Sequence, residues 1–134
     1  MMQKLSHIGI AVKNIEQSTD LFRKLFGKEP VGAEDLPENK VRTVMFEVGD
    51  SCIELTEATD AESPIAKFIE KRGEGVHHIS FTVQNVEHEL ARLKQAGFQL
   101  VDDRPRPGAD GSRVAFLHPK STNGVLIEIS QERP

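Results

Sequence analysis

The stretch HIGIAVKNIE at residues 7–16 is repeated as HISFTVQNVE at residues 78–87, and five of the ten positions are identical. In each half a strand-like segment follows in which a glutamate stands between two branched apolar residues, at 53–55 and at 127–129. Self-similarity of this kind is typical of a duplicated structural unit. The repeat therefore predicts two copies of one module that fold together.

Length and charge narrow the class of protein. The chain has 134 residues, and because either half alone is too short for a substantial core, we expect one domain, with modules at 1–62 and 63–134. The formal net charge is -4, and the absence of a lysine or arginine block predicts no nucleic-acid partner. The chain shows no apolar run of membrane-spanning length and no signal-peptide pattern, which predicts a cytoplasmic protein without a membrane partner. Cys52 is the only cysteine, so no internal disulfide can form.

Alternating apolar residues, helix caps and turn residues predict the elements of both copies. In the first copy we expect a strand at 5–12, a helix from the cap Asn14 to Gly27, an acidic turn at 34–38, and strands at 41–48 and 52–58. A connecting helix runs from Ser63-Pro64 to Gly73. In the second copy we expect a strand at 76–83, a helix from Asn85 to Gly97, and strands near 98–102, 113–117 and 124–130. The order predicts an α+β fold of two βαβββ modules.

The helices should turn apolar residues toward the sheet. Helical spacing predicts inward positions at Ile15, Thr19, Phe22, Leu25 and Phe26 in the first helix and at Val86, Leu90, Leu93 and Ala96 in the second.

Two histidines and two glutamates occupy equivalent positions in the repeat. His7 and His78 lie on the less apolar face of their strands, where a single histidine is usually a surface or hydrogen-bonded core residue. Glu54 and Glu128 lie inside apolar runs, where an unpaired carboxylate is costly to bury. Two imidazoles and two carboxylates suit a divalent transition metal, and six-coordination leaves two positions open. The duplication therefore favours one metal site made by these four residues.

The other histidines are weaker candidates. Strand parity turns His77 toward the helices, and Ser6 stands at its equivalent in the first copy. His88 is expected to face solvent on the second helix, and His118 lies at a strand end. We therefore assign His78 as the ligand of the second copy.

The chain resembles the vicinal oxygen chelate superfamily, which includes glyoxalase I, and within it most closely the methylmalonyl-CoA epimerase family. The superfamily resemblance rests on the paired βαβββ modules and the repeated His and Glu positions. The epimerase resemblance rests on three strings, SPIAKF at 63–68, GEGVHHI at 73–79, and RVAFLHPKS at 113–121 leading into GVLIE at 124–128. It covers nearly the whole chain.

The resemblance implies a reaction and a set of functional residues. The metal ligands would be His7, Glu54, His78 and Glu128, holding Co²⁺ or, alternatively, Mn²⁺, Ni²⁺, Zn²⁺ or Fe²⁺. The enzyme would interconvert (2R)- and (2S)-methylmalonyl-CoA through a metal-stabilised enolate, so its partner would be a coenzyme A thioester, and a homodimer is the family expectation. Inversion requires groups on both faces of the α-carbon, and Glu54 and Glu128 are the candidates for proton transfer. Thr43 stands where some relatives carry a further glutamate.

Substrate contacts are expected in two loops. Lys120 and Ser121 are the candidates for holding a phosphate or carboxylate of the cofactor, although an ordinary polar turn explains them equally well. Arg104 and Arg106 are either contacts to the anionic cofactor tail or part of a solvated charged turn. In the loop at 108–111 Asp110 stands where the family usually has histidine, so no role is assigned to it.

Three other functions remain open from the sequence. A glyoxalase I-like lyase or isomerase would move a proton between adjacent carbons of a thiol adduct. An extradiol-type dioxygenase would use two His and one carboxylate, so Glu54 counts against it. A metal-free binding module of the same fold would have no need of all four ligand-type residues.

Overall fold

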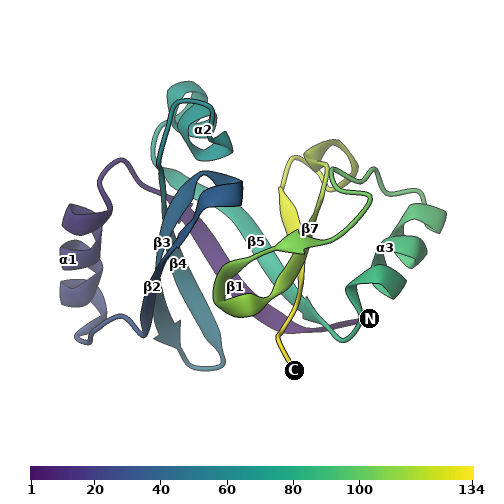
Figure 1. Ribbon diagram of the computed structural model, residues 1–134, viewed down its shortest axis with the longest axis horizontal. Helices are drawn as coiled ribbons and strands as arrows, with labels where there is room; N and C mark the ends of the chain where they lie inside the picture. The colour runs from purple at the N-terminus through teal and green to yellow at the C-terminus, as the bar shows by residue number, and fades with distance from the viewer. The chain divides into compact units, whose positions relative to one another are not determined.

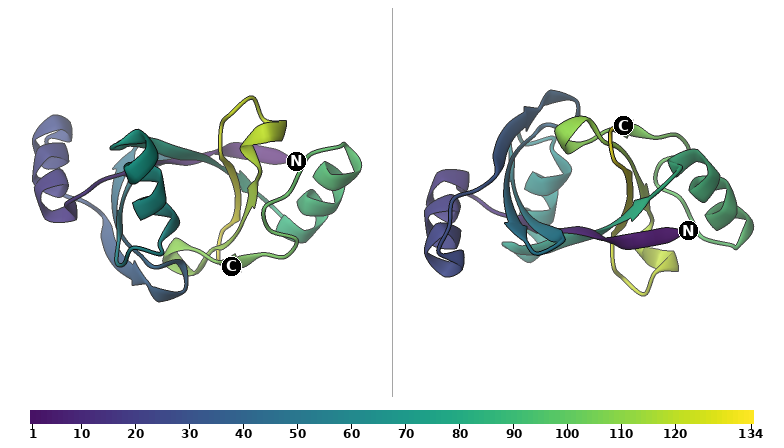
Figure 2. Two further views of the ribbon diagram at one scale, coloured as in Figure 1. Left: turned by 90° about the horizontal axis from the view of Figure 1, so that it is seen from above. Right: turned by 90° about the horizontal axis from the view of Figure 1, so that it is seen from below.

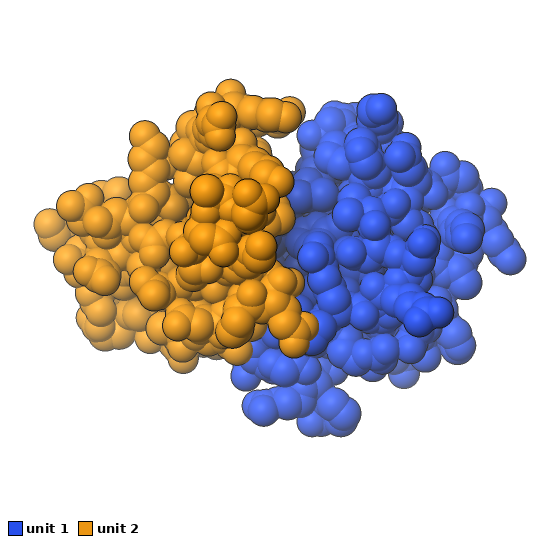
Figure 3. All heavy atoms as spheres, turned by 45° about the horizontal axis from the view of Figure 1, so that its top comes forward, with its two compact units in different colours: residues 1–7, 78–134 blue, residues 8–77 orange.

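The computed structural model describes residues 1–134. The chain forms two compact units, which Figure 3 colours separately: unit 1 contains residues 1–7 and 78–134, and unit 2 contains residues 8–77. Strands β1 (Met2–Ala11) and β5 (Gly75–Val83) are each divided between the two units. The first residues of the chain, including His7, therefore belong to the unit that holds the second copy of the repeat.

Unit 2 contains three strands of the first copy and two helices. The strands are β2 (Gly32–Leu36), β3 (Val41–Val48) and β4 (Ser51–Ala58), which pair antiparallel in the order β2-β3-β4 with β1 beyond β4. Helix α1 (Ile15–Phe26) packs on β3 and β4, and α2 (Pro64–Arg72) packs on β4 (Figure 1). Two apolar clusters fill the unit, one centred on Phe46 and Leu55 and one on Val41 and Ile65.

Unit 1 contains the remaining strands and one helix. Its strands follow the order β5-β8-β7-β6, where β6 is Arg106–Pro107, β7 is Arg113–Leu117 and β8 is Ile127–Gln131. The β5-β8 pair is parallel, and the other two pairs are antiparallel. Helix α3 (Val86–Gln95) packs beside β7 and β8, as Figure 1 and the two turned views in Figure 2 show. Leu90 and Leu93 of α3 pack against Ala115 and Ile129.

The two long helices begin in the same way. The side chain of Asn14 accepts a hydrogen bond from Gln17 N, and that of Asn85 accepts one from His88 N, each at 3.0 Å. Asn at this position satisfies a backbone N–H that the helix cannot pair. The predicted caps are confirmed, as are the Ser63 cap of α2 and the αL residue Gly27 that ends α1.

The structure corrects several local predictions. Residues 34–36 are not in a turn but in β2, an exposed strand paired with β3, and a 3₁₀ turn follows at Pro37–Asn39. The strand predicted near 98–102 is reduced to a single bridge between Leu100 and Leu117. Leu25 is 68% exposed, and Ala96 is exposed as well, because each lies on the solvent side of its helix.

None of the helices has the length and apolar character needed to cross a membrane. The organisation as one domain, with a module boundary at 62/63, stays a prediction.

Candidate metal centre

Three side chains of unit 1 converge from three strands. His7 comes from β1, His78 from β5 and Glu128 from β8, and all three are at least 93% buried. The Nε2 atoms of His7 and His78 lie 3.1 Å apart, and His7 Nε2 lies 3.3 Å from Glu128 Oε1. The sequence prediction that the repeated histidines meet is therefore confirmed.

The strand register explains why these residues share one face. In the parallel β5-β8 pair Ser80 stands opposite Glu128, so His78, two residues before Ser80, points to the same face as Glu128. On β7, Phe116 stands opposite Glu128 and places its ring edge-on to the ring of His78, with the centroids 5.6 Å apart. The histidine is thus held by packing as well as by its strand.

The distance between the two Nε2 atoms limits which of the imidazole nitrogens can carry a proton. Two Nε2 atoms at 3.1 Å cannot both carry a hydrogen pointing at the other, so at least one imidazole presents a lone pair toward its partner. At the other side of the His7 ring, Nδ1 lies 3.1 Å from the Ser6 hydroxyl. A hydrogen bond at Nδ1 fixes the ring orientation and leaves Nε2 for the centre of the site.

The distances fit a shared metal ion. With metal–ligand bonds of about 2.1 Å, adjacent ligand atoms lie about 3.0 Å apart in octahedral geometry and about 3.4 Å apart in tetrahedral geometry. The two distances from His7 Nε2, 3.1 Å and 3.3 Å, fall within this range. Two imidazole nitrogens and one carboxylate oxygen are also a donor set that divalent transition metals accept. The two distances from His7 Nε2 therefore suit the binding of a divalent ion.

The face beside these ligands is polar although it is buried. Ser80 is fully buried and Thr82 is 5% exposed, and neither hydroxyl has a hydrogen-bond partner in the protein. Buried hydroxyls are normally paired, so these two are available to ordered water or to a ligand. Alternation along β5 puts both residues on the same face as His78.

Glu54 belongs to unit 2. It lies on β4, is 6% exposed, and its Oε1 is 3.3 Å from the Thr56 hydroxyl that donates to it. The strand position and the burial agree with the sequence analysis. Its membership of the metal site stays a prediction.

Thr43 places a neutral side chain on β3 of unit 2. It is 4% exposed and stands opposite Thr56 in the β3-β4 pair. Its hydroxyl lies 3.4 Å from the carbonyl oxygen of Glu34. A threonine hydroxyl does not titrate in the physiological range, so Thr43 cannot act as a general base.

His77 lies on the helix side of its strand, as strand parity predicted. Its ring packs edge-on against Phe68 of α2, with the centroids 5.0 Å apart. Burial lowers the pKa of His77 to about 4, which keeps the imidazole neutral at physiological pH. The other histidines also follow the prediction, because His88 is exposed and His118 caps a 3₁₀ turn by accepting from Lys120 N.

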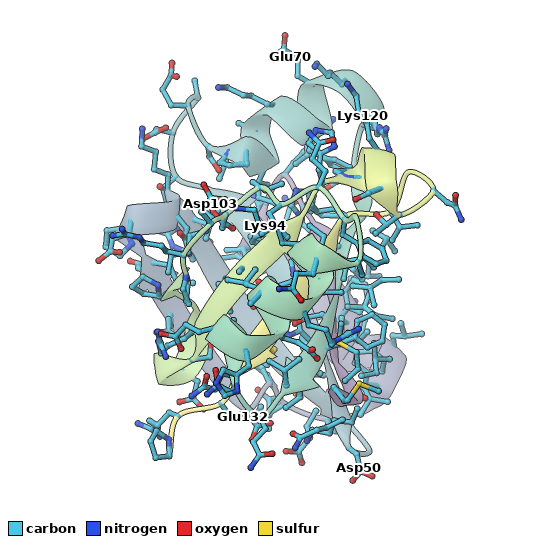
Figure 4. All side chains as sticks on the ribbon, turned by 90° about the vertical axis from the view of Figure 1, so that its right-hand side faces the viewer. Asp50, Glu70, Lys94, Asp103, Lys120 and Glu132 are labelled. Carbon is cyan, nitrogen blue, oxygen red and sulfur yellow. The ribbon has the colours of Figure 1, made fainter.

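The predicted cofactor contacts lie in this turn, Pro119–Ser121. The Ser121 hydroxyl donates to the His118 carbonyl at 3.0 Å and accepts from Gln99 N at 3.1 Å. Lys120 is exposed, and Figure 4 labels its side chain. The hydroxyl therefore supports the turn, and the cofactor-binding role of both residues stays a proposal.

Arg104 and Arg106 lie in different surroundings. Arg104 is exposed and lines a surface pocket beside α3 together with Lys94 and Asp103. Figure 4 labels the side chains of Lys94 and Asp103. Arg106 instead lies over the ring of Phe116, with its guanidinium carbon 5.2 Å from the centroid. The sequence does not predict that Phe116 contacts both Arg106 and His78, because the alternation of its strand indicates an ordinary core residue at this position.

Comparison with known proteins agrees with this architecture. Residues 6–116 match the glyoxalase/bleomycin resistance protein/dioxygenase superfamily, so the chain belongs to that class of proteins. A solved hypothetical protein of Bacillus halodurans is 46% identical, with a TM-score of 0.94 over 98% of this chain and 95% of that one. The fold is that of the superfamily, as the resemblance implied.

Two relatives define the family more narrowly. The ethylmalonyl-CoA/methylmalonyl-CoA epimerase of Cereibacter sphaeroides is 36% identical over 98% of this chain and 99% of its own. The Streptomyces coelicolor methylmalonyl-CoA epimerase, solved in complex with 2-nitronate-propionyl-CoA, is 35% identical, with a TM-score of 0.94 over 98% of this chain and 96% of its own. The chain belongs to the methylmalonyl-CoA epimerase family.

Proposed function

We propose that this protein is a metal-dependent epimerase that interconverts (2R)- and (2S)-methylmalonyl-CoA. The observation that carries the proposal is the approach of two ligand atoms to His7 Nε2, with His78 Nε2 at 3.1 Å and Glu128 Oε1 at 3.3 Å. The family relationship supplies the substrate class, because a related epimerase has been solved in complex with methylmalonyl-CoA.

Four residues would hold the ion. His7 and His78 offer Nε2 atoms, and Glu128 offers a carboxylate oxygen. Glu54 is proposed as the fourth ligand because it occupies in the first copy the position that Glu128 occupies in the second. We propose Co²⁺ as the ion that supports activity in vitro, with Mn²⁺, Ni²⁺, Zn²⁺ and Fe²⁺ as alternatives that the same donor set accepts. A bound divalent ion supplies Lewis-acid stabilisation of the negative charge that develops on the thioester oxygen.

The two glutamates would move the proton. Inversion at the α-carbon requires that one group removes the proton from one face and another returns it to the opposite face. Glu54 and Glu128 come from opposite copies of the repeat, and both are buried carboxylates. Thr43 cannot take over either transfer. We therefore assign one face of the substrate to each glutamate.

Lys120 and Ser121 are proposed to contact the coenzyme A part of the substrate. An exposed ammonium is suited to a phosphate, and Ser121 holds the turn that presents it. We further propose that the protein works in the cytoplasm as a homodimer, which light scattering on the purified chain would test by its molar mass.

The activity is tested by supplying one pure epimer to Co²⁺-loaded protein. Formation of the other epimer until both are present in equal amounts is the expected result. A control stripped of metal should show no conversion above the uncatalysed rate. Conversion of a glutathione hemithioacetal instead would identify a glyoxalase I-like enzyme, and ligand binding without turnover or bound metal would identify a binding module; either result would refute the proposal.

A further inference from the structure

Arg106 is a cation held one aromatic ring away from the metal ligands. Its guanidinium carbon lies 5.2 Å from the centroid of Phe116, and the same ring contacts His78 with a centroid separation of 5.6 Å. All three residues belong to unit 1. Phe116 therefore contacts both the guanidinium of Arg106 and the ring of His78.

The position of Arg106 is fixed by its neighbours. Its Nη2 atom lies 3.5 Å from Asp102 Oδ2, and the same oxygen accepts a hydrogen bond from Phe116 N at 2.9 Å. Val101 N in turn donates to the Phe116 carbonyl at 2.9 Å. Arg106 itself belongs to β6 and pairs with Val114 of β7. These contacts restrict the guanidinium before any ligand arrives, which lowers the entropic cost of binding.

One donor of this guanidinium is unused. Arg106 Nε is buried and has no hydrogen-bond partner, although buried N–H groups are normally paired. The contact with Asp102, at 3.5 Å, is too long for a strong charge-assisted hydrogen bond. Donors therefore remain for an oxyanion, and a guanidinium can bind a carboxylate or a phosphate through two of them.

We propose that Arg106 is a substrate-binding residue that holds an oxyanion of the thioester substrate beside the ring of Phe116. This inference rests on the proposed function, because the substrate provides the anion. Methylmalonyl-CoA carries two sources of that chemistry, the carboxylate of the acyl group and the phosphates of the cofactor.

Direct binding measurements on Co²⁺-loaded protein test the proposal with three probes. Methylmalonyl-CoA carries both kinds of anion, methylmalonyl-pantetheine carries only the carboxylate, and propionyl-CoA carries only the phosphates. The variants are Arg106→Gln, which removes the charge, and Arg106→Lys, which keeps it without the planar donor pair. Arg133→Gln is the control, since it removes an exposed charge of the same unit.

Loss of a charge-assisted contact is expected to raise the Kd of Arg106→Gln for methylmalonyl-CoA by about 10- to 100-fold, with Arg106→Lys in between. Bound Co²⁺ should stay at the wild-type level, and KM should rise more than kcat falls. If, of the two partial probes, only methylmalonyl-pantetheine shows a higher Kd in Arg106→Gln, Arg106 binds the carboxylate. If only propionyl-CoA does, Arg106 binds the phosphates.

Two results would overturn the inference. One is a Kd of Arg106→Gln within twofold of wild type for all three probes. The other is an equal loss of affinity in Arg133→Gln, which would reduce the effect to general charge attraction. Circular dichroism and the melting temperature establish that each variant is folded, and Arg106→Lys serves if Arg106→Gln is not. Because binding is measured without turnover, failure of the wild-type protein to interconvert the epimers would refute the proposed function separately.

Discussion

The Nε2 atoms of His7 and His78 are 3.1 Å apart although the two residues are 71 positions apart in the chain. They are the first residues of the two copies of the repeat, and both lie in unit 1 because the beginning of β1 groups with the second copy. The duplication thus supplies two copies of one histidine, and the beginning of β1 brings the first of them into the unit that holds the second copy.

Removal of either histidine should abolish tight metal binding. A ligand bound at 100 times its Kd raises the free energy of unfolding by about 2.7 kcal/mol, so Co²⁺ should raise the melting temperature of the wild-type protein. This rise should be lost in His7→Ala and in His78→Ala, as followed by calorimetry. His88→Ala, which removes an exposed histidine of α3, should keep it. Retention of one Co²⁺ per chain by both ligand variants would refute the site.

Replacement of each glutamate by glutamine should separate the two proton transfers. Glutamine keeps an oxygen donor for the metal but cannot act as a base, so Glu54→Gln and Glu128→Gln should each lower the rate of epimer interconversion by about 10²- to 10⁴-fold. In D₂O, one variant should still exchange the α-proton of the (2R) epimer and the other that of the (2S) epimer. Mass spectrometry of each pure epimer measures this. Loss of the same epimer's exchange in both variants would contradict the assignment of one face to each glutamate.

His77 should make the metal-free protein less stable in acid. Burial lowers the pKa of His77 to about 4, whereas the unfolded chain has the ordinary value near 6.5. Between about pH 6.5 and pH 4 the imidazole is protonated in the unfolded chain but not in the folded protein. The free energy of unfolding therefore falls as the pH is lowered through this range. The full difference corresponds to about 3 kcal/mol.

Urea unfolding at pH 7 and at pH 4.5 measures the difference. The His77→Phe variant, which keeps an aromatic ring against Phe68, should lose less stability over this interval than the wild type. An equal loss in both proteins would show that other groups cause the acid sensitivity.

Gly108 should resist even the smallest side chain. A Cβ atom there would lie 2.6 Å from Val114 Cγ1 and 2.7 Å from Ser112 Oγ, and Gly108 N donates to the Ser112 carbonyl. Gly108→Ala must therefore displace the loop at 108–112 or β7, at a cost of about 1–3 kcal/mol. Gly32→Ala is the matched control, because its Cβ would meet no atom within 4 Å. Thermal unfolding should show a lower melting temperature for Gly108→Ala only, and equal melting temperatures would argue against the tight packing.

The sequence predicted the helices and the histidine pair because those features repeat and carry clear local signals. Asn14 and Asn85 cap two helices at equivalent positions, and alternation placed His78 on a polar face. The edge strand β2 was missed because its acidic residues are exposed and show no apolar alternation. The reverse error arose near Leu100, where apolar alternation predicts a strand but only one bridge forms.

Glu89 of α3 shows a second limit of sequence patterns. It reads as a solvent-facing residue of the helix, yet it is 2% exposed and pairs with Arg92. Arg106 is similar, because its position over Phe116 depends on the pairing of β6 with β7. A strand of only two residues leaves no alternation pattern from which that pairing could be predicted. Contacts between segments far apart in the chain decide both cases.

We propose that one divalent ion, held by the repeated histidines and glutamates, gives this chain its epimerase activity. The most direct test is a titration of metal-free protein with Co²⁺ in D₂O, in which bound Co²⁺ and deuterium incorporated at the α-carbon of methylmalonyl-CoA are measured on the same samples. We expect exchange to rise in proportion to bound Co²⁺ and to saturate at one ion per chain, with neither signal in His78→Ala. Exchange at the full rate in metal-free protein, or full Co²⁺ occupancy without exchange, would contradict the claim.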